Sequence, residues 1–185
     1  MNNRKTIYLI RHCEAEGQNA DAELTANGRK QAVELADFLT DKEIQFILSS
    51  TYLRAYDSIK PLAERLHLSV HKEERLIERK LSDKKLDDWL FLLEKTFTNL
   101  DIVYEGGESS RQAMERGVAV VKECLLRKET TFAIVTHGNL LSLMWKYFDQ
   151  AVGFKEWRDL SNPDVFQMNF ELDKIIVNRL WRDKT

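Results

Sequence analysis

Near its start the sequence reads Thr6-Ile7-Tyr8-Leu9-Ile10, a short apolar run that leads directly into Arg11-His12. Apolar residues between polar neighbours are typical of a buried strand. Such a strand delivers a cation and an imidazole to the carboxyl edge of a sheet, where open α/β sheets bind their ligands. Imidazole is a nucleophile near neutral pH, and the forked donors of a guanidinium match phosphate oxygens. The stretch therefore predicts an anion-handling site at a sheet edge.

The rest of the chain alternates short apolar strands with amphipathic helices. We predict strands around residues 46–49, 68–71, 131–135, 165–170 and 175–180, and helices over residues 25–39, 52–66, 84–100, 109–127 and 138–148. Thr25 is the predicted N-cap of the first helix, and Ser109 with Gln112 resembles a capping box. This order predicts an α/β fold, a three-layer α/β/α sandwich whose mainly parallel sheet has an antiparallel edge.

Composition limits the class of protein. A chain of 185 residues, 43% of them hydrophobic, fits one domain over residues 1–185 with a sizeable core. The net charge of −2 argues against a nucleic-acid partner, and two cysteines are too few for a disulfide framework. Apolar runs fall short of the ~20 residues of a membrane span, and the start lacks a signal-peptide core. We expect a cytoplasmic protein without a membrane partner; the oligomeric state is left open.

A second histidine also follows the end of a predicted buried strand. The apolar run at residues 132–135 ends in Thr136-His137-Gly138, and the glycine lets the backbone approach a ligand closely. Arg54 follows another strand end, about one turn into a helix whose N-terminus favours anions. Four groups are thus expected to form a cage for a dianion such as phosphate: Arg11, His12, Arg54 and His137.

Phosphoryl transfer also needs a proton donor for the leaving oxygen. Glu78, just after the third predicted strand, is the best candidate, whereas Glu73 and Glu74 lie in a charge run typical of a solvated surface. The turn at residues 106–109 is able to place Glu108 and the first helical N–H groups near a ligand. A histidine at one strand end is more often structural than catalytic, so the prediction depends on the joint occurrence of these residues in this order.

Six segments resemble, in the correct order, the motifs of the histidine phosphatase superfamily, the phosphoglycerate mutase-like group of mutases and phosphatases. They are Arg11-His12-Cys13-Glu14, residues 24–32, Ser49-Ser50 with Arg54-Ala55, residues 75–78, residues 106–109 and Thr136-His137-Gly138. The resemblance implies a phosphohistidine intermediate on His12, with Glu78 acting as acid and then as base. It also implies that Arg11, Arg54 and His137 bind the phosphoryl group without a metal or other cofactor.

Three departures from the family pattern concern the substrate side. Cys13 replaces the usual glycine and is expected near the pocket floor, while Gln18 replaces asparagine and is expected to make a longer phosphate contact. Residues 80–84 replace a Gly-x-Trp-Glu-Gly segment. We expect residues 83–105 to form a cap over the pocket, and their apolar character is explained either by core packing or by a substrate with a nonpolar part.

The sequence therefore predicts a phosphatase that hydrolyses a small-molecule phosphomonoester. Gln18, Cys13, Gly138 and Glu108 are the candidate substrate-binding residues. One alternative is a 2,3-bisphosphoglycerate-dependent phosphoglycerate mutase, for which Lys84-Lys85 is the only nearby basic pair. Another is a non-catalytic module that binds phosphate or a phosphoprotein, suggested by Cys13 and Gln18.

Overall fold

A computed structural model describes residues 4–172 and 174–182. Its sheet has six strands in the order β3-β2-β4-β1-β5-β6. The strands are β1 (Lys5–Arg11), β2 (Phe46–Ser50), β3 (Val70–Glu73), β4 (Thr131–Thr136), β5 (Asp164–Glu171) and β6 (Lys174–Arg182). The first four are parallel to one another, whereas β5 pairs antiparallel with both β1 and β6. The predicted mainly parallel sheet with an antiparallel edge is confirmed.

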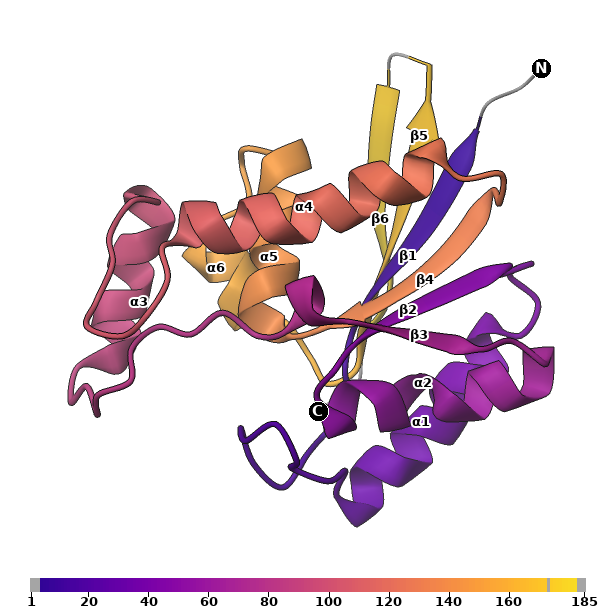
Figure 1. The fold of residues 1–185 in the computed structure, drawn as a ribbon, viewed down its shortest axis with the longest axis horizontal. Helices are drawn as coiled ribbons and strands as arrows, with labels where there is room; N and C mark the ends of the chain where they lie inside the picture. Colours follow the sequence, from indigo (N-terminus) through magenta and orange to yellow (C-terminus); the bar gives the residue numbers. More distant parts are fainter. Residues whose placement is uncertain (1–3, 173, 183–185) are drawn as a thin grey trace.

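Helices cover both faces of this sheet. They are α1 (Ala26–Leu39), α2 (Leu53–Leu66), α3 (Trp89–Thr98), α4 (Ser110–Leu126), α5 (Gly138–Phe148) and α6 (Phe154–Arg158), with a 3₁₀ turn at Glu74–Leu76. Figure 1 shows α1 and α2 below the sheet and α4 and α5 above it. The three-layer prediction is therefore confirmed.

The alternating side chains of β1 explain the two layers. Ile7 and Leu9 belong to the apolar cluster that includes α4 and α5, whereas Tyr8 and Ile10 belong to the cluster that includes α1 and α2. Successive side chains of a strand point to opposite faces, so a central strand must be apolar on both. This is why the run after Thr6 reads as continuous hydrophobic sequence.

Local signals set the start of two helices as predicted. The Thr25 side chain accepts a hydrogen bond from Gly28 N, which caps α1. Ser109 and Gln112 form a reciprocal capping box at the start of α4. Each cap satisfies backbone donors that have no partner within the helix.

The structure corrects two sequence predictions and adds one helix. The third strand lies at Val70–Glu73 rather than 68–71, and the helix expected over 84–100 is shorter, at Trp89–Thr98. The chain before this helix is held in a loop, because Asp83 N donates to Glu105 O and Glu108 N donates to Lys80 O. The helix α6 was not predicted, since five residues are too short for a hydrophobic period to show.

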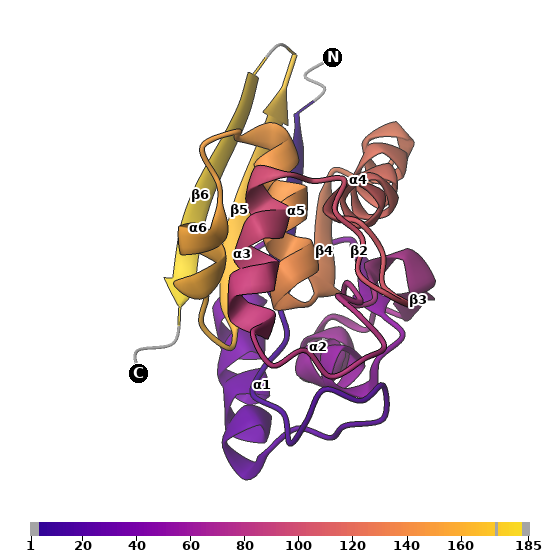
Figure 2. The same ribbon diagram turned by 90° about the vertical axis from the view of Figure 1, so that its left-hand side faces the viewer.

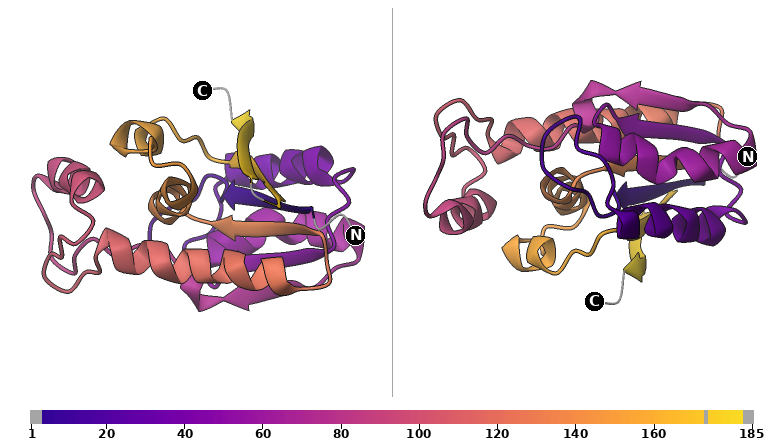
Figure 3. Two further views of the ribbon diagram at one scale, coloured as in Figure 1. Left: turned by 90° about the horizontal axis from the view of Figure 1, so that it is seen from above. Right: turned by 90° about the horizontal axis from the view of Figure 1, so that it is seen from below.

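The helices α3 and α6 lie at one end of the sheet. Figure 2 shows α3 in front of α5 and beside α6, and Figure 3 shows both α3 and α6 on the side to which β1 and β4 point. Within the described residues, no helix combines the length and apolar character needed to cross a membrane.

Candidate active site

The sheet register brings the two strand-end histidines together. Arg11 at the end of β1 pairs with Thr136 at the end of β4, so His12 and His137 leave neighbouring strands at the same level. Their ring centroids are 5.0 Å apart in an edge-to-face arrangement. Both side chains are buried. The predicted pairing of these histidines is therefore present in the fold.

Hydrogen bonds fix the tautomer of His12. Its Nδ1 lies 2.6 Å from the carbonyl oxygen of Cys13, and its Nε2 lies 3.1 Å from Nε of Arg54. A carbonyl oxygen only accepts, so Nδ1 carries the proton and donates it. The lone pair of Nε2 then accepts from Arg54. Asn162 Nδ2 also donates to His12 O at 2.7 Å, which holds the backbone of the same residue.

Arg54 is a buried cation at the start of α2. It is 1% exposed, and its Nη1 donates to the carbonyl oxygens of Gln18 and Asn19 at 3.2 and 2.8 Å. Its guanidinium carbon lies 5.0 Å from the centroid of the Tyr52 ring. These contacts hold the guanidinium against His12 and leave its charge without a carboxylate partner among the described residues.

His137 is held by a residue from a third strand. Its Nε2 lies 2.8 Å from Oγ of Ser50, the last residue of β2, and its Nδ1 is buried without a hydrogen-bond partner in the described chain. The Tyr52 ring packs edge-to-face on it at 5.1 Å. Three parallel strands thus contribute to one cluster at their carboxyl ends.

Both imidazoles are neutral at ordinary pH. Burial lowers the pKa of His12 to about 3, and the charges of Arg54 and Arg11 act in the same direction, whereas the hydrogen bond to Cys13 O opposes them. Burial likewise lowers the pKa of His137 well below its usual range, with His12 and the arginines adding to the effect. A neutral imidazole keeps a lone pair, which a nucleophile requires.

The position of the Arg11 guanidinium requires a residue without a Cβ at position 138. A Cβ added at Gly138 would lie only 3.0–3.2 Å from Nε, Cζ and Nη2 of Arg11, so glycine makes room for the guanidinium. Arg11 Nη1 donates to Leu160 O at 3.0 Å, and its Nε is buried without a partner among the described residues. Burial lowers the pKa of Arg11, and the negative charges of Glu78 and Asp164 oppose this effect.

Glu78 lies at the N-terminus of α5. Its Oε1 accepts from Arg79 N and Leu140 N at 2.9 Å each, and its Oε2 accepts from Asn139 N at 3.0 Å. The first N–H groups of a helix have no partner within it, so they serve as donors for a carboxylate. This explains how a loop residue is held at the same sheet edge as His12 and His137.

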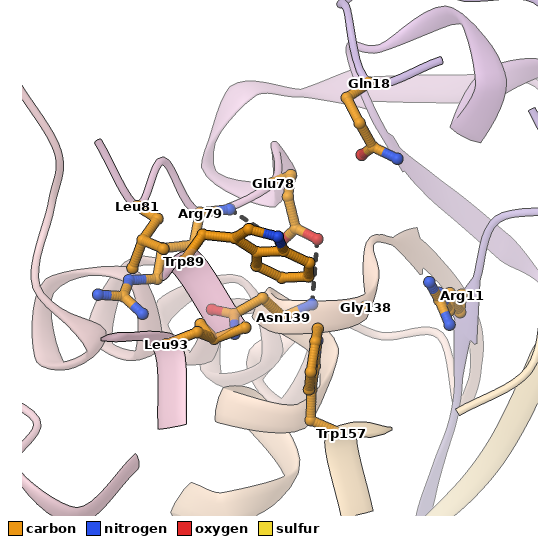
Figure 4. Close-up of a pocket in the computed structure, with 10 residues that line it drawn as sticks. All are labelled: Arg11, Gln18, Glu78, Arg79, Leu81, Trp89, Leu93, Gly138, Asn139 and Trp157. Carbon is orange, nitrogen blue, oxygen red and sulfur yellow. Dashed lines mark hydrogen bonds between the residues drawn. The ribbon is translucent and has the colours of Figure 1, made fainter. Parts of the chain in front are cut away.

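Arg11, Glu78 and Gly138 border a cavity of about 550 Å³, and His12, Arg54 and His137 lie outside its wall. Figure 4 shows Arg11 and Gln18 on one side and Arg79, Leu81 and Leu93 on the other, with Glu78 between them. We call the first half, with Arg11, Gln18 and Gly138, the strand side. The second half we call the tryptophan side; it is lined by Arg79, Leu81, Trp89, Leu93, Asn139 and Trp157.

The structure does not bring every predicted side chain to this cavity. Cys13 is fully buried in the apolar cluster with α1 and α2, because its side chain points away from that of its neighbour His12. Glu108 pairs with Arg116, at 2.6 Å between Oε1 and Nη2, and is absent from the cavity wall. Cys13 and Glu108 therefore lie outside the cavity wall, whereas Gln18 and Gly138 line it.

Sequence reasoning missed the whole polar part of the tryptophan side. Arg79 directly follows Glu78 and Asn139 directly follows Gly138, so adjacency to predicted site residues was the available signal. Trp157 had no such signal, because α6 was not predicted. No group of three or more histidine, cysteine, aspartate or glutamate side chains suited to a metal ion occurs in residues 4–172 and 174–182.

The chain matches the family model of the histidine phosphatase superfamily (branch 1) over residues 7–182. It is 27% identical over 150 residues to phosphoserine phosphatase 1 of Hydrogenobacter thermophilus, which covers 71% of this chain and 70% of that protein. It is 43% identical over 87 residues to glucosyl-3-phosphoglycerate phosphatase of Mycobacterium tuberculosis, and this match spans 43% of this chain and 39% of that relative.

Solved structures share the fold. A mycobacterial glucosyl-3-phosphoglycerate phosphatase superposes with a TM-score of 0.79 at 22% identity, covering 98% of this chain and 100% of that one. A phosphoserine phosphatase variant from Entamoeba histolytica, in complex with phosphoserine, superposes with a TM-score of 0.77 at 20% identity, covering 94% and 95%. At these identities the likeness concerns the fold.

Proposed function

The chain belongs to the histidine phosphatase superfamily and is a phosphatase, and we propose that it hydrolyses small phosphomonoesters through a phosphohistidine on His12, without a metal. The observation that carries this proposal is the tautomer of His12. Its Nδ1–H is committed to Cys13 O, so the lone pair is on Nε2, which attacks once the Nε–H of Arg54 turns from it to a phosphoryl oxygen. A fixed, neutral imidazole flanked by buried cations suits in-line attack on a phosphoryl group.

In the first step, Nε2 of His12 forms a bond to phosphorus while the bond between phosphorus and the ester oxygen breaks. Glu78, in its protonated form, gives its proton to the leaving oxygen. Arg11 and Arg54 stabilise the charge on the equatorial phosphoryl oxygens, and His137 contacts the same group. Such preorganised electrostatic contacts supply most of the rate enhancement in phosphoryl transfer.

In the second step, water attacks the phosphohistidine and Glu78 accepts its proton. The bond between phosphorus and Nε2 breaks, inorganic phosphate leaves, and His12 and protonated Glu78 are restored. Five hydrogen bonds hold Glu78 and His12 in place, so one carboxylate serves both steps without either side chain leaving its position.

The test is hydrolysis of p-nitrophenyl phosphate by wild type and by His12→Ala, with and without EDTA. We expect wild-type turnover that EDTA leaves unchanged, and a loss of at least about 10³-fold in His12→Ala. His71→Gln is the matched control, because His71 is exposed and lies outside the cavity wall. Full activity in His12→Ala, or its loss on chelation, would overturn the proposal.

A mutase using 2,3-bisphosphoglycerate is the second candidate. It must hold two phosphoryl groups, yet Lys84, one half of the basic pair at residues 84–85, pairs with Glu105 at 3.4 Å and lies outside the cavity wall. Incubation with 3-phosphoglycerate and a bisphosphoglycerate primer separates the two activities by product. We expect inorganic phosphate; accumulation of 2-phosphoglycerate would favour the mutase.

A non-catalytic binding module is the third candidate. It was suggested by Cys13 and Gln18, but the Cys13 side chain lies in the apolar core rather than in the cavity. A protein that binds phosphate tightly and releases none from any phosphomonoester would support this alternative. The cytoplasmic location and the cap role of residues 83–105 stay predictions.

A further inference from the structure

The loop between α6 and β5, residues 159–163, contacts both residues of the Arg11-His12 pair. Arg11 Nη1 donates to Leu160 O at 3.0 Å, and Asn162 Nδ2 donates to His12 O at 2.7 Å. The first contact ties one nitrogen of the guanidinium to the loop, so the orientation of this planar group depends on where the loop lies. A site is only as precise as the contacts that hold its supporting residues. The question is therefore what holds the loop.

A buried carboxylate fixes one end of this loop. Asp164, the first residue of β5, is 0% exposed and pairs with Arg11 in the sheet register. Its Oδ2 accepts from Ser161 N at 2.9 Å, which ties the loop back onto β5. Because a buried carboxylate is unfavourable unless its charge is paired, Asp164 needs a cation close by.

Arg179 of β6 supplies this cation. Its Nε donates to Asp164 Oδ1 at 2.9 Å, and its Nη2 donates both to Asp164 Oδ2 and, at 2.8 Å, to Asp159 O. The sheet register explains this reach, because Arg179 pairs with Phe166, which lies on the same face of β5 as Asp164. Its guanidinium carbon lies 5.5 Å from the centroid of the Phe166 ring. One side chain of β6 thus holds the chain at both ends of the loop.

The ion pair between Asp164 and Arg179 lies outside the cavity wall, so its effect on the site is indirect. We propose that Asp164 and Arg179 are positioning residues, which hold the loop of residues 159–163 and thereby orient the Arg11 guanidinium toward the phosphoryl group. The inference rests on the proposed function, since it names what positions one of the phosphoryl-binding groups. The outermost strand of the antiparallel edge then contributes to the reaction at the end of β1.

The test is Arg179→Met, with p-nitrophenyl phosphate as substrate and orthovanadate as an inhibitor that mimics the transition state. A guanidinium held off its position loses contacts that are strongest in the transition state, so we expect kcat to fall about tenfold while KM changes less than about twofold. The inhibition constant of orthovanadate should rise about tenfold. This constant does not depend on the concentration of folded enzyme, so a variant that is only less stable would leave it unchanged.

A double-mutant cycle measures whether the ion pair acts through Arg11. In an Arg11→Met background the loss of kcat caused by Arg179→Met should shrink to less than about twofold, because the group that the pair orients is gone. A full tenfold loss in that background would overturn the proposal. Wild-type values of kcat and of the inhibition constant in Arg179→Met would overturn it as well.

A second variant avoids the unpaired buried carboxylate that Arg179→Met leaves behind. Asp164→Asn combined with Arg179→Met removes both charges, while the new amide oxygen can still accept from Ser161 N. It should show the same rise in the inhibition constant of orthovanadate, and a wild-type value would contradict the proposal.

Arg4→Met is the matched control, because Arg4 pairs with Glu171 at the other end of β5, with 3.3 Å between Nε and Oε1. It should keep the wild-type constants, and a change equal to that in Arg179→Met would overturn the proposal. If wild type hydrolyses no phosphomonoester, the proposed function fails, and titration of tryptophan fluorescence with orthovanadate then tests the positioning by affinity. Weaker binding in Arg179→Met than in wild type supports it, whereas equal affinities, or no binding by wild type, overturn it.

Discussion

The strand side and the tryptophan side of the cavity differ in how the fold satisfies their polar groups. Behind the strand side, His12 and Arg54 bond to each other and to backbone carbonyl oxygens. On the tryptophan side, three buried polar atoms of Arg79 and Asn139 have no partner among the described residues. On the strand side, Arg11 Nε and the nearby Nδ1 of His137 also lack a hydrogen-bond partner among the described residues. The two sides differ in what holds their cation: Arg54 is bonded to His12 and to backbone carbonyl oxygens, whereas Arg79 is bonded to Thr96 Oγ1 and Glu108 O.

The largest expected effect concerns the residue between the two sides. Glu78→Gln keeps the shape of the side chain but removes the proton that a leaving alkoxide needs, so we expect kcat/KM for glycerol 3-phosphate to fall by about 10²–10⁴. Because p-nitrophenolate leaves without protonation, the loss for p-nitrophenyl phosphate should be much smaller. Glu74→Gln, on the exposed neighbouring turn, is the control. Equal losses for both substrates would contradict a role in general acid catalysis.

A second variant tests the contacts of Arg54 behind the strand side. Arg54→Lys keeps a positive charge but loses the fork that donates to His12 and to the carbonyl oxygens of Gln18 and Asn19. We expect kcat for p-nitrophenyl phosphate to fall on the order of 10²-fold. Arg65→Lys on the same helix, which pairs with Asp37 at the surface, should change it less than twofold. A lysine that restores full activity would show that only charge matters.

The buried histidines also predict a pH dependence of stability. Unfolded histidine has a pKa near 6.5, whereas burial lowers the pKa of His12 to about 3. Between these values the unfolded chain binds a proton that the folded chain excludes, so the free energy of unfolding falls as pH falls, by up to about 1.4 kcal/mol per pH unit. Urea denaturation at pH 7.5 and 5.0 should show a smaller loss for His12→Asn than for wild type. Identical losses would mean that His12 is protonated in the folded state.

The smallest expected effect concerns the helix behind the tryptophan side. Ser109→Ala removes half of the capping box of α4 and should lower the free energy of unfolding by about 1 kcal/mol. Thr98→Ala, at an exposed position whose hydroxyl bonds within its own helix, should cost less than about 0.5 kcal/mol. Both are read from urea midpoints. Equal stability of the two variants would mean that the cap makes no net contribution to the free energy of unfolding.

The sequence predicted the strand side because its signals are local. A buried strand that ends in Arg11-His12, and another that ends in His137-Gly138, place their next residues at one sheet edge. The parallel register of β1 and β4 then brings these residues close together. The role of Ser50 as the partner of His137 follows from the same rule, since it ends β2.

The tryptophan side depends on contacts between distant segments, which no local pattern encodes. Arg79 is positioned by Thr96 and Glu108, and Trp89 meets Trp157 only after the chain has folded. The apolar run at 84–100 was ambiguous for this reason: Leu93 is buried, whereas Trp89 is half exposed at the cavity. Core packing therefore explains Leu93, whereas a nonpolar part of the substrate stays a prediction for Trp89.

The central claim is that His12 carries the phosphoryl group. The most direct measurement is mass spectrometry of the peptide containing His12, after mixing the enzyme with p-nitrophenyl phosphate and quenching in alkali within the first turnovers. We predict one phosphoryl group on His12 that is stable in alkali and lost in acid, and none in His12→Ala. Rapid turnover with no phosphoryl group on His12, or with the group on another residue, would contradict the account.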